Sequence, residues 1–393
     1  MAPATDTSWD CGELLVSRTD RRGVIQFANA TFQRIAGFTT EELVNAPHKI
    51  VRHQDMPRGV FWLLWHNLLQ DKPIGAFVKN KTKSGGYYWV FAVVAPLRDG
   101  FISMRITPSP AMIRTVEPLY AKIREMEASS QMEPAESAEV LLENLKEMGF
   151  PDYEAFMARM LAAELATRDT TRDIQPDRNV TNLLDVVDNW RGVGQECDRV
   201  FEVYQTFGPT PSNMRVQASQ LREKGVALSV ISSNFAEIAN QINEGLGEFA
   251  AAGDHVTGSI YNSLFLSGVT RLLHETEEAL REEGGVDDQE LEIIADQQKV
   301  FEEKSLSNLR EVVARLRKFM TQTELIKREL SGLSTTRVMC AIENAKINQT
   351  GGNSVASIIN DLQGFQNTAD DSLLAIRGRL ATINRNIKNS LRA

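Results

Sequence analysis

No proline follows Pro211 in this chain, so its C-terminal part lacks the residue that most strongly interrupts an α-helix. Eight of the thirteen prolines and four of the five tryptophans lie within residues 1–122. The proline-free part mixes polar and apolar side chains and is predicted to form long helices. We therefore expect a mixed domain at the beginning of the chain, followed by a mostly α-helical region.

The clearest pattern in the helical region is a row of apolar residues that step by three and four near the C-terminus. It comprises Leu362, Phe365, Ala369, Leu373, Ile376, Leu380, Ile383, Ile387 and Leu391. The upstream segment LSNLREVVARLRKFM places Leu309, Val313, Leu316 and Met320 at the same spacing. Such heptad spacing is typical of helices that face each other in a coiled coil or bundle, and we expect a homodimer.

Composition and charge exclude several classes of protein. The 393 residues are 42% hydrophobic and 24% charged, which is enough to build a folded core. The net charge of −9 is concentrated after residue 122, so nucleic acid is not expected as a partner. No apolar run approaches the roughly 20 residues of a membrane span, and the N-terminus does not resemble a signal peptide, so we expect a cytoplasmic protein without membrane insertion.

Sequence motifs for catalysis are missing. The chain has no P-loop, no zinc motif, no GxSxG and no paired catalytic carboxylates in context, and it is not expected to be an enzyme. Its three cysteines are far apart and include no CxxC pair, which indicates reduced thiols and no metal framework.

The first 110 residues predict a small α+β domain with a five-stranded antiparallel sheet. Thr39 and Glu42 form a capping-box pattern ahead of a short helix, and Pro57 is placed at the first position of a longer one. Strand-like segments flank these helices, two before and three after, at residues 14–20, 23–30, 73–82, 87–97 and 101–109.

The segment VRHQDMPRGVFWLLW, residues 51–65, concentrates chemistry at one place. Arg52, His53 and Asp55 precede the start of a helix, where cationic side chains and free backbone N–H groups together bind phosphate. Trp62 and Trp65 follow on neighbouring positions of that helix. The pattern indicates either a binding site with aromatic walls or tryptophans that belong to the core.

Four sequence blocks resemble the PAS sensor domain of bacterial aerotaxis receptors. They are ANATFQRIAGFTTEEL, PHKIVRHQDMP, KNKTKSGGYYWV and VEPLY, and the resemblance covers residues 12–122. It implies a PAS fold, a flavin adenine dinucleotide (FAD) site that reports redox state, and a helical chemoreceptor-like output module. The sequence departs from the family pattern at Gln54 and Ile74.

Under this resemblance, Asn29 and Asn80 are candidates for the polar edge of the flavin ring, and Arg52 and His53 for its phosphates. Asp55 would anchor Arg52 or cap the helix, and Trp65 would wall the ring. Haem b is the alternative cofactor, because PAS domains also hold haem through one axial histidine. His53, His66 or His48 would then be the iron ligand.

The expected organisation has five parts, at residues 1–11 (tail), 12–110 (PAS sensor domain), 111–165 (helical connector and hairpin), 166–180 (polar linker) and 181–393 (helical bundle or coiled-coil output module). Within the last part, AIENAK and the later Gly351 and Gly352 resemble the hairpin tip of methyl-accepting chemotaxis proteins, which contacts a kinase and a coupling protein.

Three functions remain open from the sequence. The first is a cytoplasmic redox or oxygen sensor of the aerotaxis type that binds FAD and signals through its helical module. The second is a haem-based oxygen sensor. The third is a cofactor-free adaptor in which the PAS domain only dimerises.

Overall fold

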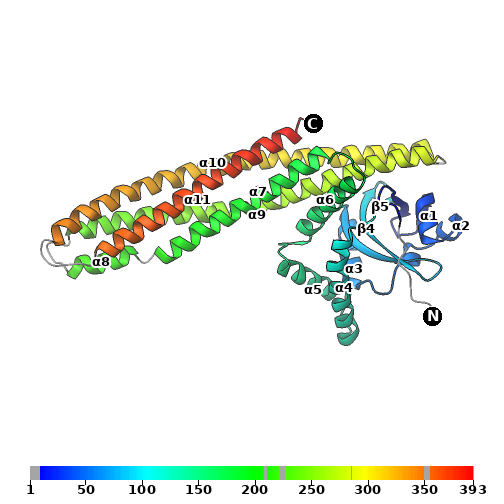
Figure 1. Ribbon diagram of the computed structural model, residues 1–393, viewed down its shortest axis with the longest axis horizontal. Helices are drawn as coiled ribbons and strands as arrows, with labels where there is room; N and C mark the ends of the chain where they lie inside the picture. The colour runs from blue at the N-terminus through cyan, green and yellow to red at the C-terminus, as the bar shows by residue number, and fades with distance from the viewer. Residues whose placement is uncertain (1–8, 208–209, 221–225, 285, 349–354, 393) are drawn as a thin grey trace. The chain divides into compact units, whose positions relative to one another are not determined.

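The computed structural model describes residues 9–207, 210–220, 226–284, 286–348 and 355–392 (Figure 1). The chain forms two compact units. Unit 1 consists of Met1–Leu184 with Tyr261–Asn308, and unit 2 of Asp185–Ile260 with Leu309–Ala393. Helices α7 (Arg178–Phe207), α9 (Val226–Glu283) and α10 (Asp288–Asn348) each contribute residues to both units, so the chain passes from one unit to the other within continuous helices.

Unit 1 contains the expected five-stranded antiparallel sheet. Its strands are β1 (Leu15–Asp20), β2 (Ile25–Ala28), β3 (Ile74–Lys81), β4 (Tyr87–Leu97) and β5 (Gly100–Ile106). They lie in the order β2-β1-β5-β4-β3, so the last strand in sequence is the central one and has the first strand as a neighbour. The α+β fold class predicted from the sequence is confirmed.

The register of the sheet decides which side chains share a face. Asn80 lies opposite Tyr88, and Ala92 lies opposite Arg105. Because side chains alternate along a strand, these residues all project from one face, together with Val78 and Ser103 two positions away. We call this the inner face.

The helices between β2 and β3 cover the inner face. They are α1 (Ala30–Ala36), α2 (Thr40–Leu43), the 3-10 turn η1 (His48–Val51) and α3 (Arg58–Leu68). The predicted capping box of Thr39 and Glu42 is present at α2. Pro57 is the N-cap of α3 and not its first residue, so this helix begins one position later than expected.

Three helices follow the sheet, α4 (Pro110–Ser130), α5 (Pro134–Glu147) and α6 (Tyr153–Thr171). Tyr120 of α4 donates its hydroxyl to the carbonyl oxygen of Phe77 at 3.0 Å, and Tyr153 of α6 donates to that of Gly75 at 2.9 Å. Both carbonyls belong to the edge strand β3, whose free side is therefore covered, and an edge covered in this way is protected from pairing with another chain.

The polar linker expected at residues 166–180 is shorter in the structure. Helix α6 continues to Thr171, and α7 (Arg178–Phe207) begins soon after, which leaves only 172–177 between them. Arg168 and Asp169 are buried, with 3% and 1% of their surface exposed. Charge alone suggested a solvated segment, but these side chains are neutralised by ion pairs inside unit 1.

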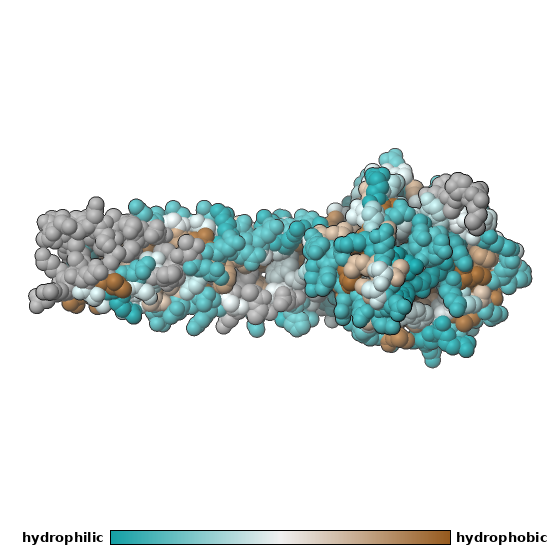
Figure 2. All heavy atoms as spheres, turned by 90° about the horizontal axis from the view of Figure 1, so that it is seen from below, coloured by the Kyte–Doolittle hydropathy of each residue, from teal (hydrophilic) through white to brown (hydrophobic). Residues whose placement is uncertain are grey.

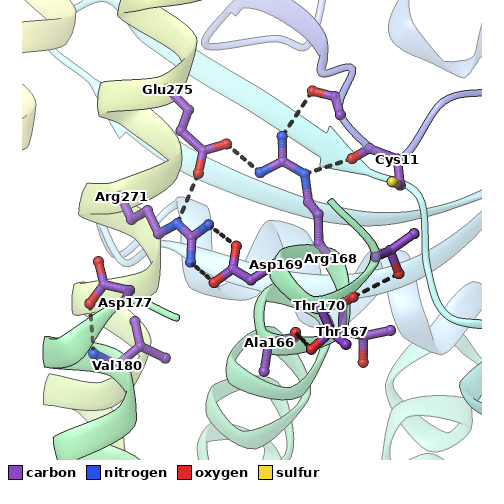
Figure 3. Close-up of polar contacts among 12 residues, drawn as sticks. Cys11, Ala166, Thr167, Arg168, Asp169, Thr170, Asp177, Val180, Arg271 and Glu275 are labelled. Atoms are coloured by element: carbon purple, nitrogen blue, oxygen red, sulfur yellow. Dashed lines mark hydrogen bonds and ion pairs between the residues drawn. The ribbon is translucent and has the colours of Figure 1, made fainter. Parts of the chain in front are cut away.

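The ion pairs connect three parts of unit 1 (Figure 3). The guanidinium of Arg168 donates to the carbonyl oxygens of Cys11 and Gly12 at 2.7 and 2.9 Å and pairs with Glu275. Arg271 pairs with Asp169 and, at 2.8 Å, with Glu275. Glu275 and Arg271 belong to α9 (Val226–Glu283), so this four-residue network joins the segment before β1, α6 and α9.

Unit 2 is helical and is built from α7, α8 (Thr210–Gln220), α9, α10 (Asp288–Asn348) and α11 (Val355–Ser390). The indole Nε1 of Trp190 in α7 donates to Thr257 Oγ1 of α9 at 2.8 Å. Arg377 of α11 pairs with Glu324 of α10 at 3.1 Å. These contacts connect neighbouring helices of one bundle within the chain.

The predicted apolar row of α11 is buried from Leu362 to Ile387, and Leu391 is half-buried. On α10, Leu309 and Leu316 are buried as expected, but Val312 and Phe319 take the places predicted for Val313 and Met320. Phe319 lies on the buried face of α10, where its ring packs against Trp190 with 5.2 Å between centroids. Because the chain itself covers the α11 row, a homodimer would have to use another surface.

The outer surface is mainly hydrophilic, with scattered hydrophobic residues on the face seen in Figure 2. Among the described helices, none contains a stretch of sufficient length and hydropathy to span a bilayer. Gly351 and Gly352, which carried the resemblance to a chemoreceptor tip, lie outside the described residues.

Candidate ligand-binding cavity

Unit 1 encloses a cavity of about 300 Å³ between the inner face of the sheet, η1 and α3. A cavity of this size is at the lower end of the range for small-molecule sites. Its walls are formed by Thr19, Arg22, Gly23, Pro47, His48, Lys49, Arg52, Phe61, Leu64, Trp65, Leu68, Val78, Asn80, Ala92, Val94, Phe101, Ser103 and Arg105.

The charges of the cavity wall are all of one sign. Arg22, Lys49, Arg52 and Arg105 line it, and the lining includes no aspartate or glutamate. Low-dielectric walls strengthen the field of such charges. The cavity is therefore suited to a ligand with negative charge.

Helix α3 and the strands β3, β4 and β5 supply most of the apolar part of the wall. Trp65 meets Phe101 of β5 edge to face at 5.8 Å between centroids, and the guanidinium of Arg52 lies 3.8 Å above the ring of Phe61. Gly23 has a φ of +80°, and a Cβ there would lie 3.0 Å from the indole of Trp65. Glycine therefore allows the turn after β1 to approach this tryptophan closely. Flat aromatic walls of this kind suit a planar ligand.

Arg105 and His48 form a polar cluster on the inner wall. Arg105 is 2% exposed and donates to Ser17 Oγ at 2.9 Å, to the carbonyl oxygen of Leu15 at 3.4 Å and to His48 Nε2. Burial lowers the pKa of Arg105 to about 10, so it remains a cation at neutral pH. Burial and the charge of Arg105 lower the pKa of His48 to about 3, so its ring is neutral.

Two buried polar groups of the inner face lack hydrogen-bond partners. They are Nδ2 of Asn80 and the hydroxyl of Tyr88, which face each other across β3 and β4. Burial raises the pKa of Tyr88, so its hydroxyl stays protonated. Unsatisfied buried donors are rare in proteins and indicate a missing partner, and Asn80 lines the cavity.

The N-terminus of α3 is fixed by a buried carboxylate from α4. Glu127, 3% exposed, accepts from the backbone N–H of Arg58 at 2.6 Å, from Ser137 Oγ of α5 at 2.5 Å and from Arg124 at 2.6 Å. Its hydrogen bonds hold the pKa of Glu127 low, although burial acts in the opposite direction. The helix that carries Trp65 is therefore attached directly to α4 and α5.

The family model for the PAS fold matches residues 25–101, which include most of the sheet, α3 and most of the cavity wall. The N-terminal domain is a PAS domain. Residues of this PAS domain are 40% identical to the aerotaxis receptor of Escherichia coli strain K12 over 111 residues, 27% of this chain and 22% of that protein. The nitrogen fixation regulatory protein of Klebsiella pneumoniae is 30% identical over 82 residues, 21% of this chain and 17% of that protein.

These alignments span about a fifth of the length of the curated relatives. A solved structure described as "Flavin Analogue Sheds Light on Light-Oxygen-Voltage Domain Mechanism" is 14% identical, covers 28% of this chain and 86% of that chain, and has a TM-score of 0.25.

Three of the predicted site residues meet in the cavity of the PAS domain. All three line it, although Arg52 directly follows η1, Trp65 belongs to α3 and Asn80 to β3. Arg52 and Asn80 also form an isolated antiparallel bridge through their backbones. The interpretation of Trp65 as a wall residue fits this position.

Asn29 has a different place from the one predicted. Its Oδ1 accepts from the N–H groups of Val16 and Phe32 at 2.9 and 3.1 Å, and its Nδ2 donates to the carbonyl oxygen of Leu14 at 2.9 Å. It is the N-cap of α1 and is not part of the cavity lining. Its amide therefore holds α1 against β1.

His53 and Asp55 lie outside the cavity lining, next to β3. Asp55 pairs with Lys79 at 2.9 Å, and neither anchors Arg52 by an ion pair nor caps α3. The hydrogen bond and charge of Lys79 lower the pKa of Asp55 against the opposing effect of burial. His53 accepts from the Asp55 N–H at 3.2 Å and meets Tyr87 edge to face. Both residues support the loop that carries Arg52.

The other two histidine candidates, His66 and His48, lie in different places. His66 is exposed, stacks on Trp62 at 4.7 Å and contacts Gln70, so it lies on the outer side of α3. His48 lines the cavity. Arg105, which no sequence motif indicated, contacts His48 on the cavity wall.

Proposed function

We propose that this protein is a signal-transduction sensor whose PAS domain binds FAD and reports redox or oxygen state to the helical module. The observation that carries the proposal is the cavity itself, which combines aromatic walls with four basic side chains and no carboxylate in its lining. FAD has a flat ring system and a diphosphate, and a cavity of this kind complements both.

Individual residues fit the parts of this cofactor. Phe61 and Trp65 offer apolar contact to a ring, and the amide nitrogen of Asn80 is a donor on the cavity wall that needs an acceptor. Arg22 and Lys49 are exposed at the cavity and are placed for a phosphate, with Arg52 beside them. When bound, the flavin would supply reversible uptake of electrons and protons. The similarity of the domain to the aerotaxis receptor supports this function.

Haem fits the histidines of the PAS domain less well. Iron needs a histidine with a free ring nitrogen that faces the cavity. Nε2 of His48 is engaged by Arg105 and Ser17. His53 and His66 do not line the cavity. A flavin is therefore the better match for the residues present.

The output in this proposal is carried by helices and involves no enzymatic step. Helix α3 is bonded to α4 and α5 through Glu127, and the separate network of Figure 3 joins α6 to α9. Shifts of the cavity wall would move these helices together, because their contacts are buried ion pairs and hydrogen bonds. The expected partners are a second copy of the chain in a cytoplasmic homodimer, and a chemotaxis kinase or coupling protein.

The absorbance spectrum of the purified full-length protein tests the cofactor. We expect the blue-region bands of an oxidised flavin, and chromatography of the released cofactor should identify FAD. An intense Soret band would replace this function by haem-based oxygen sensing. A colourless protein that takes up no added FAD would favour the cofactor-free adaptor.

A further inference from the structure

Arg105 has an unusual environment for a buried arginine. The side chain is 2% exposed, and its hydrogen-bond partners are a serine hydroxyl, a backbone carbonyl and a neutral histidine. The ring of Phe32 lies 4.9 Å away and also carries no charge. These contacts orient the guanidinium without neutralising it.

A buried charge without a counterion is expensive, because water no longer solvates it. Other buried cations of unit 1 show the usual solution, since Lys79 pairs with Asp55 and Arg168 pairs with Glu275. Arg105 differs in that it lines the cavity, whose wall also carries the unpartnered amide nitrogen of Asn80. The position therefore favours a ligand that brings negative charge to this wall.

We propose that Arg105 makes the cavity bind the reduced flavin more tightly than the oxidised flavin. The inference rests on the proposed flavin site and adds the residue that tunes it. Reduction takes two electrons from an external donor and one proton from solvent to N5, and the remaining negative charge resides on the pyrimidine part of the ring. An uncompensated cation beside the ring favours this charged form over the neutral one.

The charged residues of the network in Figure 3 do not contribute to this effect. They pair with each other and lie outside the cavity lining. Arg22, Lys49 and Arg52 line the cavity too, but the first two are exposed and screened by water. Arg52 is half-buried, and the negative charge of Glu127 acts on its guanidinium, so its positive charge is partly compensated. Arg105 is therefore the cation with the strongest expected effect on the ring.

Redox titration of the flavin-loaded full chain, with dithionite as reductant, tests the proposal. Arg105→Gln removes the charge and keeps a hydrogen-bonding side chain, and Arg105→Lys keeps the charge. We expect Arg105→Gln to reduce the preference for reduced flavin at least tenfold, a negative shift of about 30 mV for a two-electron couple. Arg105→Lys should shift less, and Arg114→Gln on exposed α4 should not shift.

An Arg105→Gln potential equal to or above that of the unchanged protein would overturn the proposal. Circular dichroism checks the fold of each variant. Should Arg105→Gln not fold, Arg105→Met removes the charge and keeps a long unbranched side chain at the cavity wall, and the same negative shift is required. An unchanged protein that binds no flavin would overturn the proposed function and this inference together, whereas a bound flavin with unshifted variants would overturn the inference alone.

Discussion

Arg105 donates a hydrogen bond from Nη2 to Nε2 of His48 on the wall of the PAS cavity. An arginine can only donate, so this nitrogen of His48 must accept, and the ring proton is assigned to Nδ1. Ser17 reinforces the arrangement at 3.3 Å from the same nitrogen, and Phe32 stacks on the imidazole at 6.0 Å between centroids. The folded domain therefore requires His48 to be neutral.

This requirement predicts a loss of stability in acid. The pKa of His48 falls from 6.5 to about 3 on folding, so between these values the unfolded chain binds a proton that the folded chain does not. The free energy of unfolding should therefore decrease as the pH falls from 6.5, by up to about 3 kcal/mol at pH 4 from this group. In His48→Gln, whose amide oxygen can accept from Arg105 without titrating, urea unfolding should depend less on pH.

His66→Gln is the matched control, because His66 is exposed on the outer side of α3. It should keep the pH dependence of the unchanged protein. Equal pH dependence in His48→Gln and the unchanged protein would show that His48 does not titrate against folding.

Arg52 and His53 are neighbours in sequence but should differ in their effect on cofactor binding. Arg52 lines the cavity, whereas His53 supports the loop from outside. Arg52→Ala should weaken FAD binding by about 1.5–3 kcal/mol, the range for a hydrogen bond to a charged group. His53→Ala should weaken it by less than about 0.5 kcal/mol. Fluorescence titration of the stripped protein with FAD measures both affinities.

Lys83→Ala is the control for the loss of one positive charge. Lys83 is exposed, pairs with Glu42 and does not line the cavity. A larger effect of His53→Ala than of Arg52→Ala would reverse the assignment of these two residues.

The sequence predicted the fold, and three of the six residues proposed for the site line the cavity. Alternation and turn residues predicted all five strands, and Arg52, Trp65 and Asn80 stood in recognisable blocks. Asn29 was placed at the flavin edge, but it is the N-cap of α1. The sequence carried a signal for this role, because an asparagine directly before a helical segment is a typical N-cap.

Arg105 was missed because strand β5 is buried on both faces, so alternation cannot tell which side an arginine takes. Only the pairing of Arg105 with Ala92 places it on the inner face. The buried face of α10 was ambiguous in the same way, because Val312 and Val313 are both apolar. The contact of Phe319 with Trp190 determines which face is buried.

The network of Figure 3 should stabilise unit 1 substantially. Asp169 is 1% exposed, and Asp169→Ala would leave the largely buried Arg271 with Glu275 as its remaining partner. We expect a cost of about 3 kcal/mol in urea unfolding, because a buried charge loses its counterion. The double variant Asp169→Ala with Arg271→Ala should cost less than the sum of the single changes.

The pair of Arg281 and Glu277 offers a control on the same helix. It has similar geometry, with 2.7 Å between Nη2 and Oε1, but 62% of the arginine side chain is exposed. Arg281→Ala should change stability by less than about 0.5 kcal/mol. Additive effects of Asp169→Ala and Arg271→Ala would argue against a coupled network.

The last prediction compares two leucines of α11. Leu380 is fully buried in unit 2, and Leu374 is 68% exposed. Leu380→Asp should destabilise the bundle by at least about 3 kcal/mol, because it removes buried apolar surface and buries a charge. Leu374→Asp should leave the free energy of unfolding within about 0.5 kcal/mol. Circular dichroism should report lost helicity only for Leu380→Asp.

The same pair of variants separates folding from assembly and from cofactor binding. The residues that line the cavity all belong to unit 1, so Leu380→Asp should keep its FAD while unit 2 loses helicity. A homodimer that uses the exposed side of α11 would dissociate in Leu374→Asp with helicity unchanged, which sedimentation velocity would detect. Loss of FAD in Leu380→Asp would mean that the PAS domain depends on the bundle for its fold, and unchanged helicity in this variant would contradict the buried row of α11.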